Sequence, residues 1–95
     1  MATVRVGDFE WETEKARVNL AKHGVSFEEA MTVFLDELAV PYADVGDPER
    51  LVLIGESRLG RVILVVFTER LASGTLRLVS ARRATKRERR AYEED

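Results

Sequence analysis

The chain has 95 residues, which is enough for one small domain with a single core, and we expect that domain to span residues 1–95. It contains no cysteine and one histidine, which excludes a disulfide framework and a thiolate or histidine-rich metal site. The formal net charge of −2 hides an asymmetry, because residues 1–50 hold eleven acids and five bases whereas residues 51–95 hold six acids and ten bases.

A basic half in a weakly acidic chain is typical of nucleic-acid binding. No apolar stretch approaches the length of a membrane span or of a signal peptide, so we expect no membrane association and a cytoplasmic location. We also expect no cofactor, because the sequence has no glycine-rich phosphate loop and no nucleophilic triad.

The first half of the chain predicts a short strand followed by two helices. Residues Val4 to Trp11 alternate weakly between apolar and polar side chains, which favours a strand. Residues Glu12 to His23 have helical spacing and are followed by Gly24, a typical helix terminator. Ser26 to Glu29 form a capping box, and apolar side chains then recur at helical spacing through Leu35. The short connection predicts a compact helical hairpin.

The second half predicts a sheet and a last helix. Leu38 to Tyr42 is an edge-strand candidate because it contains Pro41. Three apolar runs separated by turns predict a three-stranded antiparallel meander between Leu51 and Arg82, and a capping box starts a helix at about Thr85. The predicted fold class is therefore α+β, with helices on one side of the sheet and a core that includes Phe27, Phe34 and Val65.

Arginines cluster at the predicted strand ends, and this clustering suits binding of a phosphate chain. Cleavage of RNA by its own 2′-hydroxyl, the activity that the family resemblance described below implies, needs a general base, an acid and positive charge at the phosphate. Arg61, Arg70 and Arg82 are candidates to supply that charge, because a guanidinium stays protonated and its fork matches phosphate oxygens. Strand alternation places Arg61 and Glu69 on one face and Arg70 on the other, and it makes Arg82 a continuation of the face of Leu76, Leu78 and Ser80.

Glu69 is the candidate general base, although an ordinary ion pair with Arg61 or Arg82 would give the same sequence pattern. His23 is a second candidate base, but the negative end of its helix is sufficient to explain its position. Trp11 is either a stacking platform for a nucleobase or a core residue.

The last helix is basic and has almost no apolar stripe. We expect four residues near its start to bind the RNA backbone, or else to form a solvated face: Arg83, Lys86, Arg87 and Arg90. Packing within the domain can hold a helix with so little apolar surface only weakly. We therefore expect a partner protein to bind over it, with Tyr92 as the anchor.

Several short motifs, in their order along nearly the whole chain, resemble the BrnT family of toxins from bacterial type II toxin–antitoxin systems. They are Phe9-Glu10-Trp11, Lys22-His23-Gly24-Val25-Ser26-Phe27-Glu28-Glu29-Ala30, Leu53-Ile54-Gly55, Thr68-Glu69-Arg70 and Ser80-Ala81-Arg82-Arg83-Ala84-Thr85-Lys86-Arg87-Glu88-Arg89. The resemblance implies a RelE-like fold, metal-independent cleavage of RNA and growth inhibition. It also implies neutralisation, in a hetero-oligomer, by a BrnA-like antitoxin with a DNA-binding domain. Members often carry His or Tyr immediately before Thr-Glu-Arg, where this chain has Phe67.

Two hypotheses follow. The first is an endoribonuclease toxin, supported by the resemblance and by the arginines at the strand ends. The alternative is a non-catalytic module that binds nucleic acid or protein, supported by the absence of a decisive general base.

Overall fold

A computed structural model describes residues 2–43 and 46–94. Its elements in chain order are β1 (Thr3–Val6), β2 (Phe9–Glu12), α1 (Thr13–His23), α2 (Phe27–Thr32), the 3-10 turn η1 (Val33–Leu35), β3 (Val40–Tyr42), β4 (Leu51–Glu56), β5 (Val62–Arg70), β6 (Thr75–Arg83) and α3 (Lys86–Glu93). No helix in these ranges is both long and apolar enough to cross a membrane.

All six strands belong to one sheet, in the order β1-β2-β6-β5-β4-β3. Strands β4, β5 and β6 are antiparallel neighbours in the middle of the sheet, and β2 pairs with β6 in parallel. The protein is a mixed α+β structure, as predicted, but its sheet is larger than a three-stranded meander. The expected single N-terminal strand is a hairpin, because Gly7 adopts φ 58° and turns β1 back onto β2.

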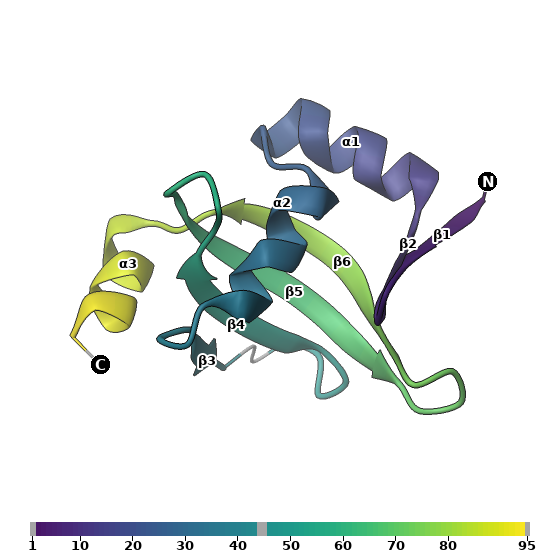
Figure 1. The fold of residues 1–95 in the computed structure, drawn as a ribbon. Helices are drawn as coiled ribbons and strands as arrows, with labels where there is room; N and C mark the ends of the chain where they lie inside the picture. The colour runs from purple at the N-terminus through teal and green to yellow at the C-terminus, as the bar shows by residue number, and fades with distance from the viewer. Residues whose placement is uncertain (1, 44–45, 95) are drawn as a thin grey trace.

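Helices α1 and α2 lie across one face of the sheet, which we call the helix face (Figure 1). Its core is centred on Phe27, Ile63 and Val65, each fully buried, and Trp11 packs edge-on against Phe27 with ring centroids 5.9 Å apart. The prediction of Phe27 and Val65 as core residues is confirmed. Phe34 is only partly buried and contacts this core from its margin.

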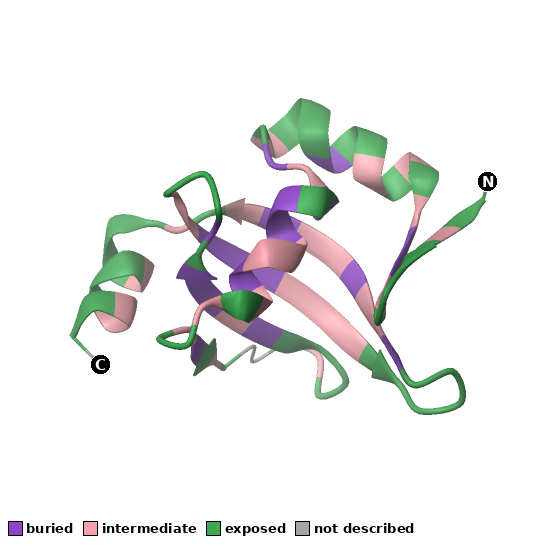
Figure 2. Cartoon of the chain, in the orientation of Figure 1, coloured by how far each residue is buried: buried purple, intermediate pink, exposed green. Residues whose placement is uncertain are grey.

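The opposite face carries a smaller cluster of Val40, Val52, Ile54 and Leu64. We call it the α3 face, because Ala84, just before the last helix, and Tyr92, near the end of that helix, pack against this cluster. The prediction that the helices lie on one side of the sheet is therefore wrong for α3. Helix α3 lies at the end of the sheet where β6 finishes, far from the N-terminal hairpin (Figure 1). It has no buried residue, and its ribbon is mostly exposed (Figure 2).

A bulge in β6 changes which side chains share a face. Val66 pairs with Ser80 and the next residue of β5, Phe67, pairs with Leu78, so one residue of β6 is extra. Leu78 and Ala81 therefore both lie in the helix-face core, while Arg82, opposite Leu64, lies on the α3 face. The prediction that Arg82 continues the face of Leu78 is wrong, because strict alternation does not survive a bulge.

Candidate functional site

Arg82 and Glu88 form a two-pronged ion pair where β6 meets α3. Arg82 Nη1 donates to Glu88 Oε1 at 2.8 Å, and Nη2 donates to Oε2 at 2.9 Å. The side chain of Arg82 is 37% exposed and that of Glu88 is 12% exposed. This is the fork geometry by which a guanidinium recognises a carboxylate or a phosphate. The fork of Arg82 is therefore occupied by a carboxylate of the same chain.

The helix cap holds the carboxylate of Glu88 from a second side. Glu88 Oε1 accepts a hydrogen bond from the backbone N–H of Thr85 at 2.9 Å, and Thr85 Oγ1 accepts one from the N–H of Glu88 at 3.2 Å. This is the predicted capping box. The hydrogen bond from Arg82 is the main cause that lowers the pKa of Glu88, so the carboxylate is ionised at neutral pH.

A hollow of about 240 Å³ on the α3 face lies beside this ion pair. Its remaining lining is apolar or aromatic and comes from β3, the residue after it, β4 and β5: Tyr42, Ala43, Val52, Leu64 and Val66. Apolar surface with one convergent pair of charged groups is the usual composition of a small-ligand site. Sequence reasoning did not single out Tyr42 or Glu88 as site residues, because Glu88 was explained by the cap and Tyr42 by the edge strand.

Arg61 lies on the other face of the sheet and is committed to internal contacts. Its guanidinium contacts both carboxylate oxygens of Glu29, with Nε donating to Oε2 at 2.9 Å, and Nη2 also donates to the carbonyl of Gly24 at 3.0 Å. Glu29 is 2% exposed and also accepts from the hydroxyl of Ser57 at 2.7 Å. The hydrogen bond from Arg61 is the main cause that lowers the pKa of Glu29. Arg61, in the turn between β4 and β5, thus joins that turn to α2 and to the turn before α2.

Glu69 and Arg70 lie at the opposite end of β5 and are exposed. Glu69 pairs across the sheet with Leu76, whereas Arg82 pairs with Leu64. Five strand positions separate those two points on β5, which corresponds to about 17 Å. The structure therefore does not bring Glu69 or Arg70 together with Arg82.

The expected RNA-binding residues Arg83, Lys86, Arg87 and Arg90 are all exposed, at the end of β6 and along α3. Tyr92, the expected partner-binding residue, is partly buried. Its hydroxyl donates to Asp36 Oδ2 at 2.6 Å, and this bond is the main cause that raises the pKa of Tyr92 to about 12. Trp11 is 2% exposed in the core, which leaves no free ring face for a nucleobase.

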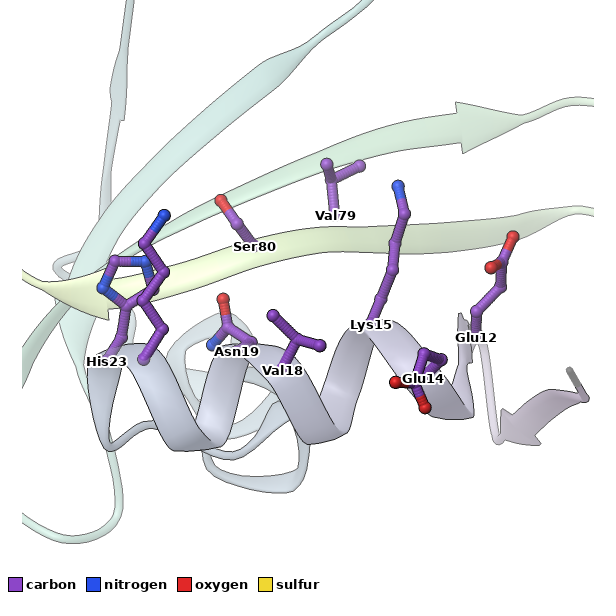
Figure 3. Close-up of a pocket in the computed structure, with 9 residues that line it drawn as sticks. Glu12, Glu14, Lys15, Val18, Asn19, His23, Val79 and Ser80 are labelled. Carbon is purple, nitrogen blue, oxygen red and sulfur yellow. The ribbon is translucent and has the colours of Figure 1, made fainter.

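His23 lines a separate groove of about 430 Å³ between α1 and β6, together with Lys15 and Lys22 (Figure 3). Beneath it, Asn19 is buried and closes the edge of β6. Asn19 Nδ2 donates to the carbonyls of Val25 and Ala81, and Oδ1 accepts from the N–H of Ala81 at 3.1 Å. A lone asparagine within a helix gave no sequence signal for this role.

Comparisons with known proteins agree with this architecture. Residues 11–88 match the family model described as the ribonuclease toxin BrnT of type II toxin–antitoxin systems. The chain is also similar to the 1.1 Å crystal structure of the Brucella abortus ribonuclease toxin BrnT, with a TM-score of 0.63 and 28% sequence identity over 80% of this chain and 94% of the Brucella chain. No curated protein sequence matches the chain. Because the family model spans most of the sequence, the chain belongs to the BrnT family of ribonuclease toxins of type II toxin–antitoxin systems.

Proposed function

We propose that this protein is a metal-independent endoribonuclease with a RelE-like fold that acts in the cytoplasm and inhibits growth until an antitoxin binds it. The observation that carries the proposal is the fork of Arg82, held at the rim of the hollow on the α3 face beside a basic helix. In a complex with RNA, a phosphate replaces the carboxylate of Glu88 in this fork. The guanidinium then stabilises the charge that develops on the phosphate during cleavage.

The basic residues around Arg82 extend the same surface. Arg83, Lys86, Arg87 and Arg90 are exposed on one continuous segment, so they attract the RNA backbone over several phosphates. Arg61, Glu69 and Arg70 remain candidate catalytic residues, but only from their sequence pattern. The ion pair of Arg61 with Glu29 favours a structural role for Arg61. Glu69 and Arg70 do not line the hollow.

The partner in this proposal is a BrnA-like antitoxin with a DNA-binding domain. The charge of α3 favours an acidic antitoxin segment that covers Lys86, Arg87 and Arg90 and so denies that surface to RNA. Because Tyr92 is already bonded to Asp36, it would anchor such a segment only by its partly exposed ring. Both proteins together form the expected hetero-oligomer.

One observation favours the alternative of a non-catalytic binding module. Among the described residues, each carboxylate with a resolved change in pKa has a lowered pKa, including Glu29 and Glu88, and a lowered pKa makes a carboxylate a weaker base. A cleavage assay separates the two hypotheses. The purified protein is incubated with single-stranded RNA and excess EDTA, and the product ends are analysed.

The ribonuclease proposal predicts internal cleavage that leaves a 2′,3′-cyclic phosphate and a 5′-hydroxyl. It also predicts growth arrest on expression, relieved by co-expression of the antitoxin. Binding of RNA without any cleavage, with or without added Mg²⁺, would support the binding module instead.

A further inference from the structure

The hollow on the α3 face contains a carboxylate for which the proposed function has so far given no chemical role. Of the described residues that line this hollow, Glu88 is the one acid, and it lies next to the guanidinium that would hold the phosphate. Glu69, by contrast, lines a different depression with Thr68, Arg70 and Leu71. The geometry therefore offers one carboxylate within reach of a phosphate on Arg82.

The orientation of Glu88 is fixed from two directions. Its two oxygens face the two terminal nitrogens of Arg82, and Oε1 also faces the N–H of Thr85. When a phosphate takes the fork, the bond to Thr85 still holds the carboxylate at the site. Oε2 then has no remaining protein donor among the described contacts and is free to accept a proton. The hydrogen bonds from Arg82, the main cause of the lowered pKa of Glu88 in the free protein, are then broken, so the carboxylate is a stronger base in the complex than in the free protein.

We propose that Glu88 is the general base of RNA cleavage, and that the hollow beside it holds the nucleoside whose 2′-hydroxyl it deprotonates. This inference rests on the proposed ribonuclease function. The 2′-hydroxyl proton passes to Glu88, and the 2′-oxygen forms a bond to the adjacent phosphorus. The bond from that phosphorus to the 5′-oxygen breaks, and the 5′-oxygen takes a proton from solvent water. Glu88 then returns its proton to the resulting hydroxide, so that atoms and charge balance.

The lining of the hollow fits an unpaired nucleoside. Leu64 and Val66 line the hollow from β5, and Tyr42 lines it from β3. Aromatic rings and apolar side chains are common platforms for unstacked bases in RNA recognition. The charged pair at the rim places the sugar and phosphate on the same side as α3, where the basic residues lie. Single-stranded RNA is therefore the substrate class that this site takes.

The test compares Glu88→Gln with two matched controls. Glutamine keeps the capping box, because either residue serves at that position, but it cannot take the proton. Glu93→Gln removes the same charge from an exposed position of α3. Thr85→Ala removes the hydroxyl that accepts from the N–H of Glu88, and it keeps the backbone N–H that donates to the carboxylate of Glu88. For each protein, thermal unfolding, binding of a 2′-O-methyl RNA and the single-turnover cleavage rate at saturating RNA are measured.

Glu88→Gln should cleave about 10²- to 10⁴-fold more slowly, the usual contribution of a positioned acid or base, while it binds the 2′-O-methyl RNA at least as tightly as the parent. Glu93→Gln should keep the parental rate. The inference is overturned if Glu88→Gln cleaves at the parental rate, if Thr85→Ala loses as much rate as Glu88→Gln, or if Glu69→Gln loses the rate and Glu88→Gln does not. In each of these cases the parent still cleaves RNA, whereas a parent without cleavage would refute the proposed function itself.

Discussion

Arg61 and Arg82 are the same residue type at the same end of the sheet, and their surroundings give them different roles. Arg61 pairs with Glu29, which is 3% exposed at its side chain, and lies on the helix face. Arg82 pairs with Glu88 at the rim of a hollow on the α3 face. An ion pair with a buried acid stays formed, because a buried carboxylate without its partner lowers the stability of the fold. A pair at the rim of a hollow can exchange one oxyanion for another.

Replacing Arg61 with alanine should therefore lower the stability of the fold, with a smaller effect on the rate of RNA cleavage. The change leaves Glu29 buried without its guanidinium, which should lower the free energy of unfolding by about 3 kcal/mol. The matched control is Arg17→Ala, which removes an exposed pair with Glu14 on α1 and should leave the free energy of unfolding nearly unchanged. Urea unfolding measures both variants. An Arg61→Ala protein with parental stability and lost cleavage would instead place Arg61 at the RNA.

Individual residues were the hardest level to predict from the sequence. The sequence predicted that arginines lie at strand ends, and Arg82 does lie near the end of β6. Its face was misassigned, because the bulge near Val79 inserts one residue that alternation does not reveal. The buried Asn19 was missed, because an asparagine in a helix is usually a solvated residue and its bond to Ala81 joins positions 62 residues apart.

At the level of elements, α3 is held by polar contacts and has almost no core of its own. The capping box starts it, the pair of Arg82 and Glu88 ties its first turn to β6, and Tyr92 ties its last turn to Asp36. With no buried residue, the helix gains little from packing, so these contacts decide how firmly it stays in place.

Removing the hydroxyl in Tyr92→Phe should loosen α3 without affecting the sheet. The variant loses a hydrogen bond to an ionised carboxylate, which is among the stronger kinds. Amide hydrogen exchange should become faster in Lys86–Glu93, whereas the amides of β5 in the same sample serve as the internal control and should be unchanged. Equal exchange of α3 in parent and variant would show that the contact with Asp36 does not anchor this helix.

Elements with a strong local signal were predicted well. The predicted capping box of Thr85 and Glu88 begins α3. Ser26 caps α2 as predicted, but the carboxylate of Glu29 binds Arg61 and Ser57 and does not complete the second box. Gly24 ends α1 with φ 69°, and β4, β5 and β6 occupy the three apolar runs. The N-terminal hairpin was read as one strand, because the run before Gly7 is short and exposed. The parallel pairing of β2 with β6 joins distant parts of the chain, and no local pattern reports such a pairing.

At the level of the whole molecule, three ion pairs each join two different segments of the fold. Glu29 with Arg61 joins α2 to the β4–β5 loop, Glu10 with Arg77 joins β2 to β6, and Glu88 with Arg82 joins α3 to β6. The pKa values of all three glutamates are lowered: mainly by Arg61 for Glu29, by the hydroxyl of Thr75 for Glu10 and by Arg82 for Glu88.

These shifts predict how stability depends on pH. A carboxyl whose pKa is lower in the folded than in the unfolded protein stabilises the fold above its unfolded pKa, here 4.5, and loses that contribution as the pH falls through the folded value. The urea midpoint should thus be nearly constant from pH 7 to about 5.5 and should fall steadily from about pH 4.5 downward. Glu29→Gln should show a shallower fall in acid. A midpoint that stays constant to pH 3 would show that these pairs do not couple to folding.

The most direct test of the account is the cleavage of single-stranded RNA in excess EDTA by the parent, by Arg82→Lys and by Arg82→Ala. Lysine keeps the positive charge and loses the two-pronged fork that the structure shows. We expect internal cleavage by the parent and a fall of about 10²- to 10³-fold in the rate at saturating RNA for Arg82→Ala. Arg82→Lys should recover only a small part of that loss. Cleavage by Arg82→Lys at the parental rate would contradict the account, because charge alone would then be sufficient and the fork at the rim of the hollow would have no part in the chemistry.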